Sequence, residues 1–206
     1  MTLRFGTDGV RGVANTELTP ELVLALGRAA ARVLEAGRVG RVVIGRDTRR
    51  SGPLLEAALA AGFAAEGVDV ELLGVVPTPT VAWVSAADGL PGAVISASHN
   101  PFADNGIKLF GAGGTKLSDA DEERLEDELD RILRSKDDAE AVPSGAKVGQ
   151  IRPAEGLVSR WADAVAASIE DRRLDGLRVV IDCANGSASH HAAPMLRRLG
   201  AVVEVL

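Results

Sequence analysis

The sequence predicts an α/β protein: a mixed, mostly parallel sheet sandwiched by helices, followed by the incomplete beginning of a second, similar α/β domain. Two observations lead to this prediction. Short apolar runs such as "VVIG" alternate with longer segments whose apolar residues recur at helical spacing. Such alternation favours parallel strands with helices on both faces. Hydrophobic residues make up 46% of the 206 residues, which is enough to fill a buried core.

The first helix is predicted to begin at Thr19-Pro20 and to end at Gly37. Thr19 can cap the helix, Pro20 suits its first turn, and glycine commonly ends a helix. The next four elements end at glycine or proline in a similar way, and a fifth leads into a polar loop. They are predicted to be a strand at 41–45, a helix at 53–66, a strand at 68–77, a helix at 79–88 and a strand at 92–98.

A polar loop then leads to a predicted strand at 106–111 and a tight turn, "GAGG". Ser118 is placed to cap an acidic helix at 119–133. One face of that helix is predicted to be apolar, and it comprises Leu125, Leu129, Ile132 and Leu133.

Residues 135–153 show no sustained periodicity, so we place a domain boundary near residue 153, with domains at 1–153 and 154–206. Beyond it we expect a helix at 156–169 and a strand–helix–strand unit that ends at Leu206. Two strands and one helix seldom form a stable domain. We therefore expect the N-terminal part of a longer protein, with an exposed edge that favours a homo-oligomer or a domain swap. The alternative is a last strand that docks on the first domain.

The net charge of −6 arises within residues 119–138, which hold ten acids and four bases. The balanced remainder argues against a nucleic-acid partner, because such a surface needs a basic excess. Apolar runs are too short to span a bilayer, which argues against a membrane partner. Cys183 is the single cysteine, which fits a cytoplasmic protein.

The stretch "ISASHNPFADNGIKLFG" at 95–111 contains the first candidate for chemistry, Ser98. A predicted strand delivers Ser98 to the end of a sheet, where the sites of α/β proteins gather. The flanking residues do not match the G-x-S-x-G motif of hydrolases. The alternative is that Ser98 and Asn100 only cap turns.

Two further loops are rich in glycine or arginine. "FGTDGVRG" at 5–12 allows a close approach of the backbone to a ligand and carries Arg11, unless Arg11 is simply solvated. "GRDTRRSG" at 45–52 lies between a strand and a helix, a position that suits an anion. Here Asp47 is expected to pair with an arginine and fix the turn. A serine hydroxyl among cations and exposed amides suits phosphoryl transfer.

Three other patterns are not interpreted as sites. "GAGGTKL" does not match the phosphate-binding G-x-x-x-x-G-K-[ST] motif, so a β-turn is preferred. The acidic residues at 119–130 form a solvated helix face. His190 and His191 are adjacent and lack a third metal ligand in the sequence.

These motifs together resemble the α-D-phosphohexomutases. The resemblance is carried by "FGTDGVRG", "GRDTRRSG", "ISASHNPFADNGIKLF" and "DCANGSASHHAAPMLRRLGA", and it spans nearly the whole chain. The family has four domains, so the resemblance implies that this sequence covers the first and the beginning of the second. The first motif is most similar to the branch that acts on glucosamine phosphates. Branches that act on glucose or mannose phosphates stay open, as does a non-catalytic module that binds sugar phosphates.

The resemblance implies that Ser98 carries a phosphoryl group and exchanges it with a small sugar phosphate. Glucosamine 6-phosphate would be converted to glucosamine 1-phosphate through glucosamine 1,6-bisphosphate. Lys108 would serve in acid–base chemistry, Arg11 would contact the phosphoserine region, and His99 would support the loop. The residues expected to support the phosphate or the loop are Gly6, Thr7, Asp8, Gly9, Arg46, Arg49 and Asn100.

The resemblance also implies Mg²⁺, with an oxygen of the phosphate on Ser98 as one ligand. The family's other ligands come from a D-G-D-x-D-R motif in the second domain, and this motif does not occur in the 206 residues. The sugar-recognition and phosphate-binding loops of the third and fourth domains are also outside the sequence. We therefore expect the chain by itself to lack mutase activity.

Overall fold

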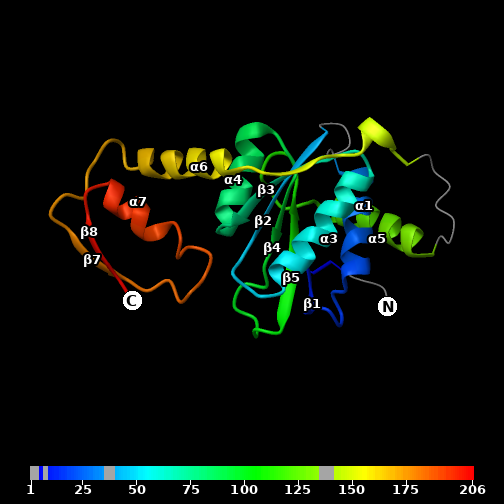
Figure 1. Ribbon diagram of the computed structural model, residues 1–206, viewed down its shortest axis with the longest axis horizontal. Coiled ribbons are helices and arrows are strands. Elements are labelled where there is room, and N and C mark those ends of the chain that lie inside the picture. The colour runs from blue at the N-terminus through cyan, green and yellow to red at the C-terminus, as the bar shows by residue number, and fades with distance from the viewer. Residues whose placement is uncertain (1–4, 7–8, 35–39, 135–141) are drawn as a thin grey trace.

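A six-stranded mixed sheet forms the centre of the computed structural model, which describes residues 5–6, 9–34, 40–134 and 142–206 (Figure 1). The strand order is β1-β5-β4-β2-β3-β6, and β5 alone runs antiparallel to its neighbours. The predicted fold class is therefore confirmed. The strands are β1 (Val10–Val13), β2 (Arg41–Arg46), β3 (Asp69–Val75), β4 (Gly92–Ile95), β5 (Asp104–Phe110) and β6 (Ile151–Pro153).

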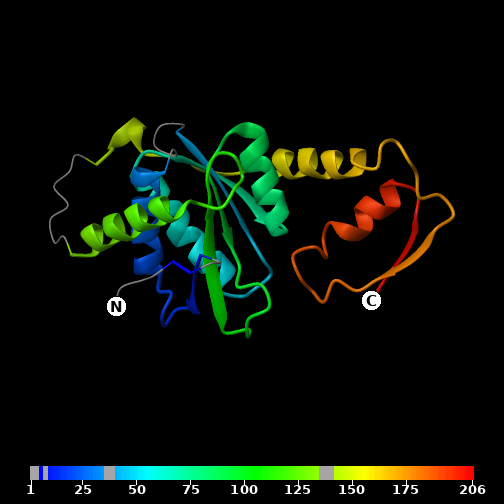
Figure 2. The same ribbon diagram turned by 180° about the vertical axis from the view of Figure 1, so that it is seen from behind.

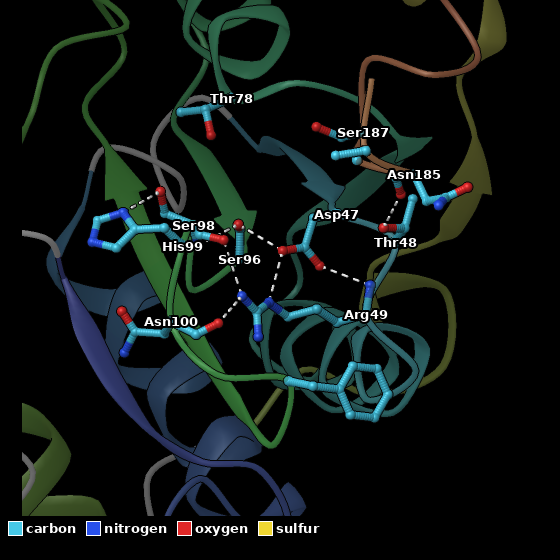
Figure 3. Close-up of a pocket in the computed structure, with 13 residues that line it drawn as sticks. Asp47, Thr48, Arg49, Thr78, Ser96, Ser98, His99, Asn100, Asn185 and Ser187 are labelled. Carbon is cyan, nitrogen blue, oxygen red and sulfur yellow. Dashed lines mark hydrogen bonds and ion pairs between the residues drawn. The ribbon is translucent and has the colours of Figure 1, made fainter. Parts of the chain in front are cut away.

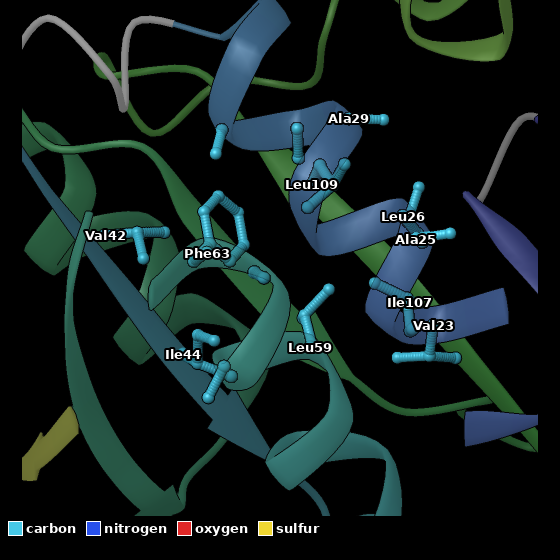
Figure 4. Close-up of a cluster of buried hydrophobic side chains, with 14 of the residues drawn as sticks. Val23, Ala25, Leu26, Ala29, Val42, Ile44, Leu59, Phe63, Ile107 and Leu109 are labelled. Carbon is cyan, nitrogen blue, oxygen red and sulfur yellow. The ribbon is translucent and has the colours of Figure 1, made fainter. Parts of the chain in front are cut away.

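Helices cover both faces of this sheet (Figure 2). One face packs against α1 (Pro20–Val33), α3 (Gly52–Ala65) and α5 (Asp119–Arg134). The other face packs against α4 (Thr78–Asp88) and the first part of α6 (Glu155–Ala167). The larger core lies between the first helix layer and the sheet, and it is filled mainly by aliphatic side chains (Figure 4). Two covered faces explain why the central strands are almost continuously apolar.

Local chemistry accounts for the ends of several helices. The Thr19 side chain accepts a hydrogen bond from the amide of Leu22 at 3.3 Å, so Thr19 caps α1 as predicted. α4 ends at Gly89, whose φ of 64° lies in the left-handed region that glycine adopts without strain. The Ser118 hydroxyl accepts from the amide of Asp121, which confirms the expected cap of α5.

Two strands were not expected from the sequence, and one side chain lies on a different face. β1 is a four-residue strand within a glycine-rich stretch, and β6 has three exposed residues. Leu133 was predicted to be on the apolar face of α5, but it is 46% exposed because it lies beside that face, whereas Leu125, Leu129 and Ile132 are buried. The predicted end of the first helix at Gly37 lies outside the described residues.

A second, smaller unit follows α6. The strands β7 (Arg178–Ile181) and β8 (Val202–Val205) form a parallel pair, with α7 (Ala192–Arg198) between them in the chain (Figure 1). The alternative in which the last strand joins the first sheet is wrong, because in the described part of the chain β8 pairs with β7 alone. Strand β6 belongs to the large sheet, and α6 leads from that sheet toward the small one; a domain boundary near residue 153 stays a prediction.

The small unit contacts the large one through side chains near α7. The imidazole Nε2 of His191 donates to the carbonyl of Val75 at 3.0 Å. The same ring meets the ring of Trp161 edge-on, with centroids 5.9 Å apart. A hydrogen bond between Thr48 and Asn185 adds a further contact. None of the described helices is long and apolar enough to cross a membrane.

Candidate active site

Ser98 lies just beyond the carboxyl end of β4, where the chain leaves the sheet. Its φ of 56° is in the left-handed region, which a non-glycine residue adopts only when its surroundings hold it there. The side chain is exposed, and its hydroxyl lies 3.3 Å from Nδ1 of His99. An exposed hydroxyl on a strained backbone, beyond the carboxyl end of a central strand, fits a chemical role better than a turn cap.

The four predicted catalytic residues line one hollow of about 250 Å³. Ser98 and His99 come from the segment that leads from β4 into β5 (residues 96–104, the serine loop). Arg11 comes from β1, and Lys108 from β5, where it lies opposite Val94 of β4. The charged groups among its described lining residues are cationic, which favours an anionic ligand beside the Ser98 hydroxyl. The remaining lining residues are Thr78, Val94 and Ser96.

Asn100 connects Arg11 to the serine loop. The amide oxygen of Asn100 accepts from a terminal nitrogen of Arg11 at 2.8 Å, and its amide nitrogen donates to Asp104 at 3.0 Å. The predicted supporting role of Asn100 therefore has a geometric basis, because Asn100 orients the guanidinium of Arg11 beside Ser98.

Gly6 and Gly9 pair with each other directly before β1. Their amides donate to each other's carbonyls at 3.0 and 3.1 Å. Gly9 has a φ of 81°, and a Cβ there would collide with the carbonyl of Ile107 in β5. Close contact between Gly9 and β5, together with the pairing of Arg11 with Gly106, places Arg11 near the site. The predicted residues Thr7 and Asp8 lie outside the described residues.

The two arginines predicted to support the phosphate, Arg46 and Arg49, point to different partners. Nε of Arg46 donates to Glu56 at 3.0 Å, and Arg46 is not among the residues that line either hollow near Ser98. Arg49 lies beside the serine loop and donates to four of its carbonyl oxygens, so it contacts the loop backbone. The expected pairing of Asp47 with an arginine is confirmed, since Nε of Arg49 lies 3.1 Å from Asp47.

Asp47 was expected only to fix a turn, and Ser96 was not predicted as a site residue, yet both lie within the site. The Ser96 hydroxyl donates to Asp47 at 2.7 Å and accepts from the amide of Ser98 at 3.0 Å (Figure 3). Both residues line the larger hollow beside Ser98. The alternation of serines in "SAS" was the available signal, but residue spacing alone cannot identify a tertiary hydrogen bond.

A larger hollow of about 820 Å³ also has Ser98 in its lining. One wall is the serine loop, and the facing wall comes from residues 184–187 of the small unit (Figure 3). The Thr48 hydroxyl donates to the carbonyl of Asn185 at 2.8 Å and joins the two walls. Seven of its 13 lining residues carry a hydroxyl or an amide side chain, which suits a polyhydroxylated ligand. The wall at 184–187 was not predicted as part of a site.

The described residues do not form a magnesium site by themselves. The structure contains no group of three or more His, Cys, Asp or Glu side chains that could hold a metal within the described ranges. Asp47 is the carboxylate that lines the larger hollow, and it already bonds Ser96 and Arg49. Ser98, through a phosphate, remains the predicted metal contact of this chain.

Comparison with known proteins gives the same family across most of the chain. Residues 2–136 match the family model "Phosphoglucomutase/phosphomannomutase, alpha/beta/alpha domain I". Phosphoglucosamine mutase from Desulforudis audaxviator is 51% identical over 201 residues, which cover 97% of this chain and 44% of the relative. Phosphoglucosamine mutase from Frankia alni is 51% identical over 216 residues, which cover 100% of this chain and 46% of the relative. The chain thus spans about half the length of the curated relatives it matches.

A solved structure agrees with these relatives. It is a phosphoglucomutase/phosphomannomutase family protein from Burkholderia thailandensis, with a TM-score of 0.72 and 30% identity. The match covers 100% of this chain and 43% of that one. Sequence, fold and the position of the serine loop lead to one conclusion: the chain belongs to the phosphoglucomutase/phosphomannomutase family.

Proposed function

We propose that this chain supplies the phosphoryl-carrying serine of a phosphoglucosamine mutase. The observation that carries the proposal is the hollow in which Ser98, His99, Arg11 and Lys108 meet. Glucosamine phosphates are the preferred substrates because the relatives at 51% identity are named phosphoglucosamine mutases. Conversion of glucose or mannose phosphates is the alternative within the same family.

In the proposed reaction, phosphorylated Ser98 transfers its phosphoryl group to the free hydroxyl of glucosamine 6-phosphate. The bond between Ser98 Oγ and phosphorus breaks, a bond from phosphorus to the sugar oxygen forms, and the proton that the sugar hydroxyl loses is balanced by one that Ser98 Oγ gains. The resulting glucosamine 1,6-bisphosphate returns its other phosphoryl group to Ser98, and glucosamine 1-phosphate leaves. The serine is phosphorylated again at the end, so the reaction has no net consumption of phosphate.

The residues around Ser98 have distinct tasks in this scheme. Arg11, held by Asn100, offsets negative charge that spreads over the phosphoryl oxygens in the transition state. Lys108 lines the same hollow and is the proposed proton carrier for the sugar hydroxyl. The larger hollow, with its hydroxyl and amide lining, is the proposed space for the sugar. Mg²⁺ would offset further charge on the phosphoryl group; one ligand would be an oxygen of the phosphate on Ser98, and the other ligands would come from outside the described residues.

Intact-mass spectrometry tests the proposal directly. The protein that contains this chain is dephosphorylated, then incubated with glucosamine 1,6-bisphosphate. We expect the mass of one phosphoryl group to be added, and a peptide map to place it on Ser98. Ser98→Ala should abolish the addition, whereas Ser118→Ala, which removes a serine hydroxyl at the start of α5, should leave it intact.

A wild-type protein that gains no mass from the bisphosphate would contradict the proposed function. Label on the Ser98→Ala variant would contradict the assignment of the nucleophile. Parallel incubations with glucose and mannose 1,6-bisphosphates distinguish the branches of the family, because the preferred sugar gives the fastest labelling.

A further inference from the structure

The backbone of Ser98 is held on both of its sides by side chains from elsewhere in the fold. On one side, its amide donates to the hydroxyl of Ser96 at 3.0 Å. On the other side, its carbonyl accepts from a terminal nitrogen of Arg49 at 3.0 Å. Because both flanking peptide groups are fixed, neither φ nor ψ of Ser98 can rotate without breaking one of these bonds.

Asp47 connects the two groups that hold Ser98. One of its carboxylate oxygens accepts from the Ser96 hydroxyl at 2.7 Å and from Nε of Arg49 at 3.1 Å. Its other oxygen accepts from the backbone amide of Arg49 at 3.0 Å, which fixes the turn after β2. Asp47 therefore orients both the hydroxyl and the guanidinium that bind the Ser98 backbone.

Burial makes this connection stiff. The side chains of Arg49 and Asp47 are only 11% and 15% exposed, so water competes weakly for their hydrogen bonds. Arg49 also donates to the carbonyls of Asn100, Pro101 and Asp104, which extends the same support along the loop. The loop is thus held by residues of the turn that follows β2, a central strand of the sheet.

We propose that Ser96, Asp47 and Arg49 are positioning residues that hold Ser98 in its left-handed conformation and aim its hydroxyl into the hollow. This inference rests on the proposed phosphoryl transfer, and it assigns Arg49 to the loop backbone rather than to the phosphate. The contacts that Ser96 and Arg49 make with Ser98 go through its main chain. They are therefore independent of whether Oγ carries a phosphoryl group, and the loop keeps its place in both halves of the reaction.

The first test measures phosphoryl transfer from glucosamine 1,6-bisphosphate to Ser98 in quenched samples by intact mass. Ser96→Ala should lower the maximal labelling rate by about tenfold or more, because small misplacements of a reacting atom are costly. The bisphosphate concentration that gives half the maximal rate should change by less than about twofold, since Ser96 acts through Ser98. Ser96→Thr should restore the rate because threonine keeps the hydroxyl.

Ser118→Ala is the matched control. Like Ser96, Ser118 accepts from a backbone amide and donates to an aspartate, at 3.2 and 2.8 Å, but it does so at the start of α5. Its loss should reduce stability without changing the labelling rate. An equal loss of rate in Ser96→Ala and Ser118→Ala would overturn the inference, because both would then act through stability alone.

Hydrogen exchange at the Ser98 amide, followed by NMR, tests the geometry without catalysis. The wild type and Ser96→Thr should protect this amide, and Ser96→Ala should lose the protection. An amide that exchanges equally fast in the wild type and in Ser96→Ala overturns the inference. A Ser96→Ala variant that is labelled at the wild-type rate overturns it as well. A wild-type protein that takes no label contradicts the proposed function instead, and amide exchange then still decides whether Ser96 holds the loop.

Discussion

The guanidinium of Arg49 gathers four carbonyl oxygens of the serine loop, at 2.6 to 3.0 Å. Lysine keeps the charge but has one nitrogen, so it cannot match this planar set of donors. We expect Arg49→Lys to lower the free energy of unfolding by about 2 kcal/mol, because several carbonyls of the loop lose their partners. Urea unfolding measures the change.

The neighbouring Arg50 provides the control for this substitution. It lies in the same turn but is exposed, so Arg50→Lys should leave the unfolding free energy within about 0.5 kcal/mol of the wild type. Equal stability of the Arg49→Lys variant and the wild type would show that the charge of residue 49, rather than its fork of donors, supports the loop.

For individual residues, the sequence predicted which side chains lie together at the site, but it did not predict which contacts hold the serine loop. Ser98, His99, Lys108 and Arg11 were predicted from motifs, and they line one hollow; their chemical roles stay predictions. Sequence could not distinguish Arg46 from Arg49, because both lie in the same polar stretch at the end of β2. Only the direction of each side chain in three dimensions sends one to Glu56 and the other to the loop.

Helices α1 and α3 cross at Gly27 of α1 and Gly62 of α3, and this contact sets the separation of the two helices. A Cβ on Gly62 would collide with the carbonyl of Leu24 and lie 2.9 Å from the amide nitrogen of Arg28. Alanine normally favours a helix over glycine, but here the two backbones would have to move apart. We expect Gly62→Ala to cost about 1–3 kcal/mol of stability, as overpacked cores do, and thermal unfolding to show the loss.

Gly156 allows the opposite test on another helix. It lies in α6, and a Cβ there would meet nothing within 4 Å. Gly156→Ala should therefore leave the melting temperature unchanged or raise it slightly. If Gly62→Ala behaved in the same way as Gly156→Ala, the helix contact at Gly62 would not be as close as described.

Elements with a strong period were predicted well, and short ones were not. The apolar periodicity of α1 and α5, the proline and glycine that bound α3, and the buried runs of β2 and β3 identify these elements without tertiary information. β1 is short and contains a glycine, and its pairing with β5 joins residues about a hundred positions apart, such as Val10 and Ile107. β6 is three exposed residues that include a proline, so it has no apolar pattern to detect.

Across the whole molecule, the larger hollow depends on parts far apart in the chain. Residues 184–187 face the serine loop because Thr48 bonds Asn185 and His191 bonds Val75. Local sequence patterns describe the second unit as a strand–helix–strand, but they contain no information on where it docks. The fold class was thus accessible from sequence, whereas the second wall of the candidate site was not.

Ion pairs connect the three helices that cover one face of the sheet. Arg28 and Arg32 of α1 both pair with Glu66, directly after α3, and Arg32 also pairs with Glu128 of α5 at 3.0 Å. Hydrogen bonds from Arg131, and then from Arg32, hold the pKa of Glu128 below its ordinary value of 4.5, although burial acts in the opposite direction. Folding therefore favours the ionised form of Glu128.

A lowered pKa in the folded state gives this carboxylate a defined effect on acid stability. Its contribution is complete above the ordinary glutamate pKa and is lost as the pH falls through the lowered folded pKa. Glu128→Gln should reduce the free energy of unfolding by about 0.5–1 kcal/mol at pH 7, the range of partly exposed pairs. The difference from the wild type should shrink as the pH is lowered toward about 3, because below the ordinary glutamate pKa the unfolded state takes up a proton and the advantage of the folded carboxylate decreases.

Urea unfolding at several pH values measures this difference. Glu123→Gln removes the same charge from the exposed face of α5, and it should change stability little at either pH. If Glu128→Gln were as far below the wild type at pH 3 as at pH 7, the loss would come from packing or hydrogen bonding of the neutral side chain. A loss confined to neutral pH would instead show that the ionised carboxylate contributes through its pairs with Arg131 of α5 and Arg32 of α1.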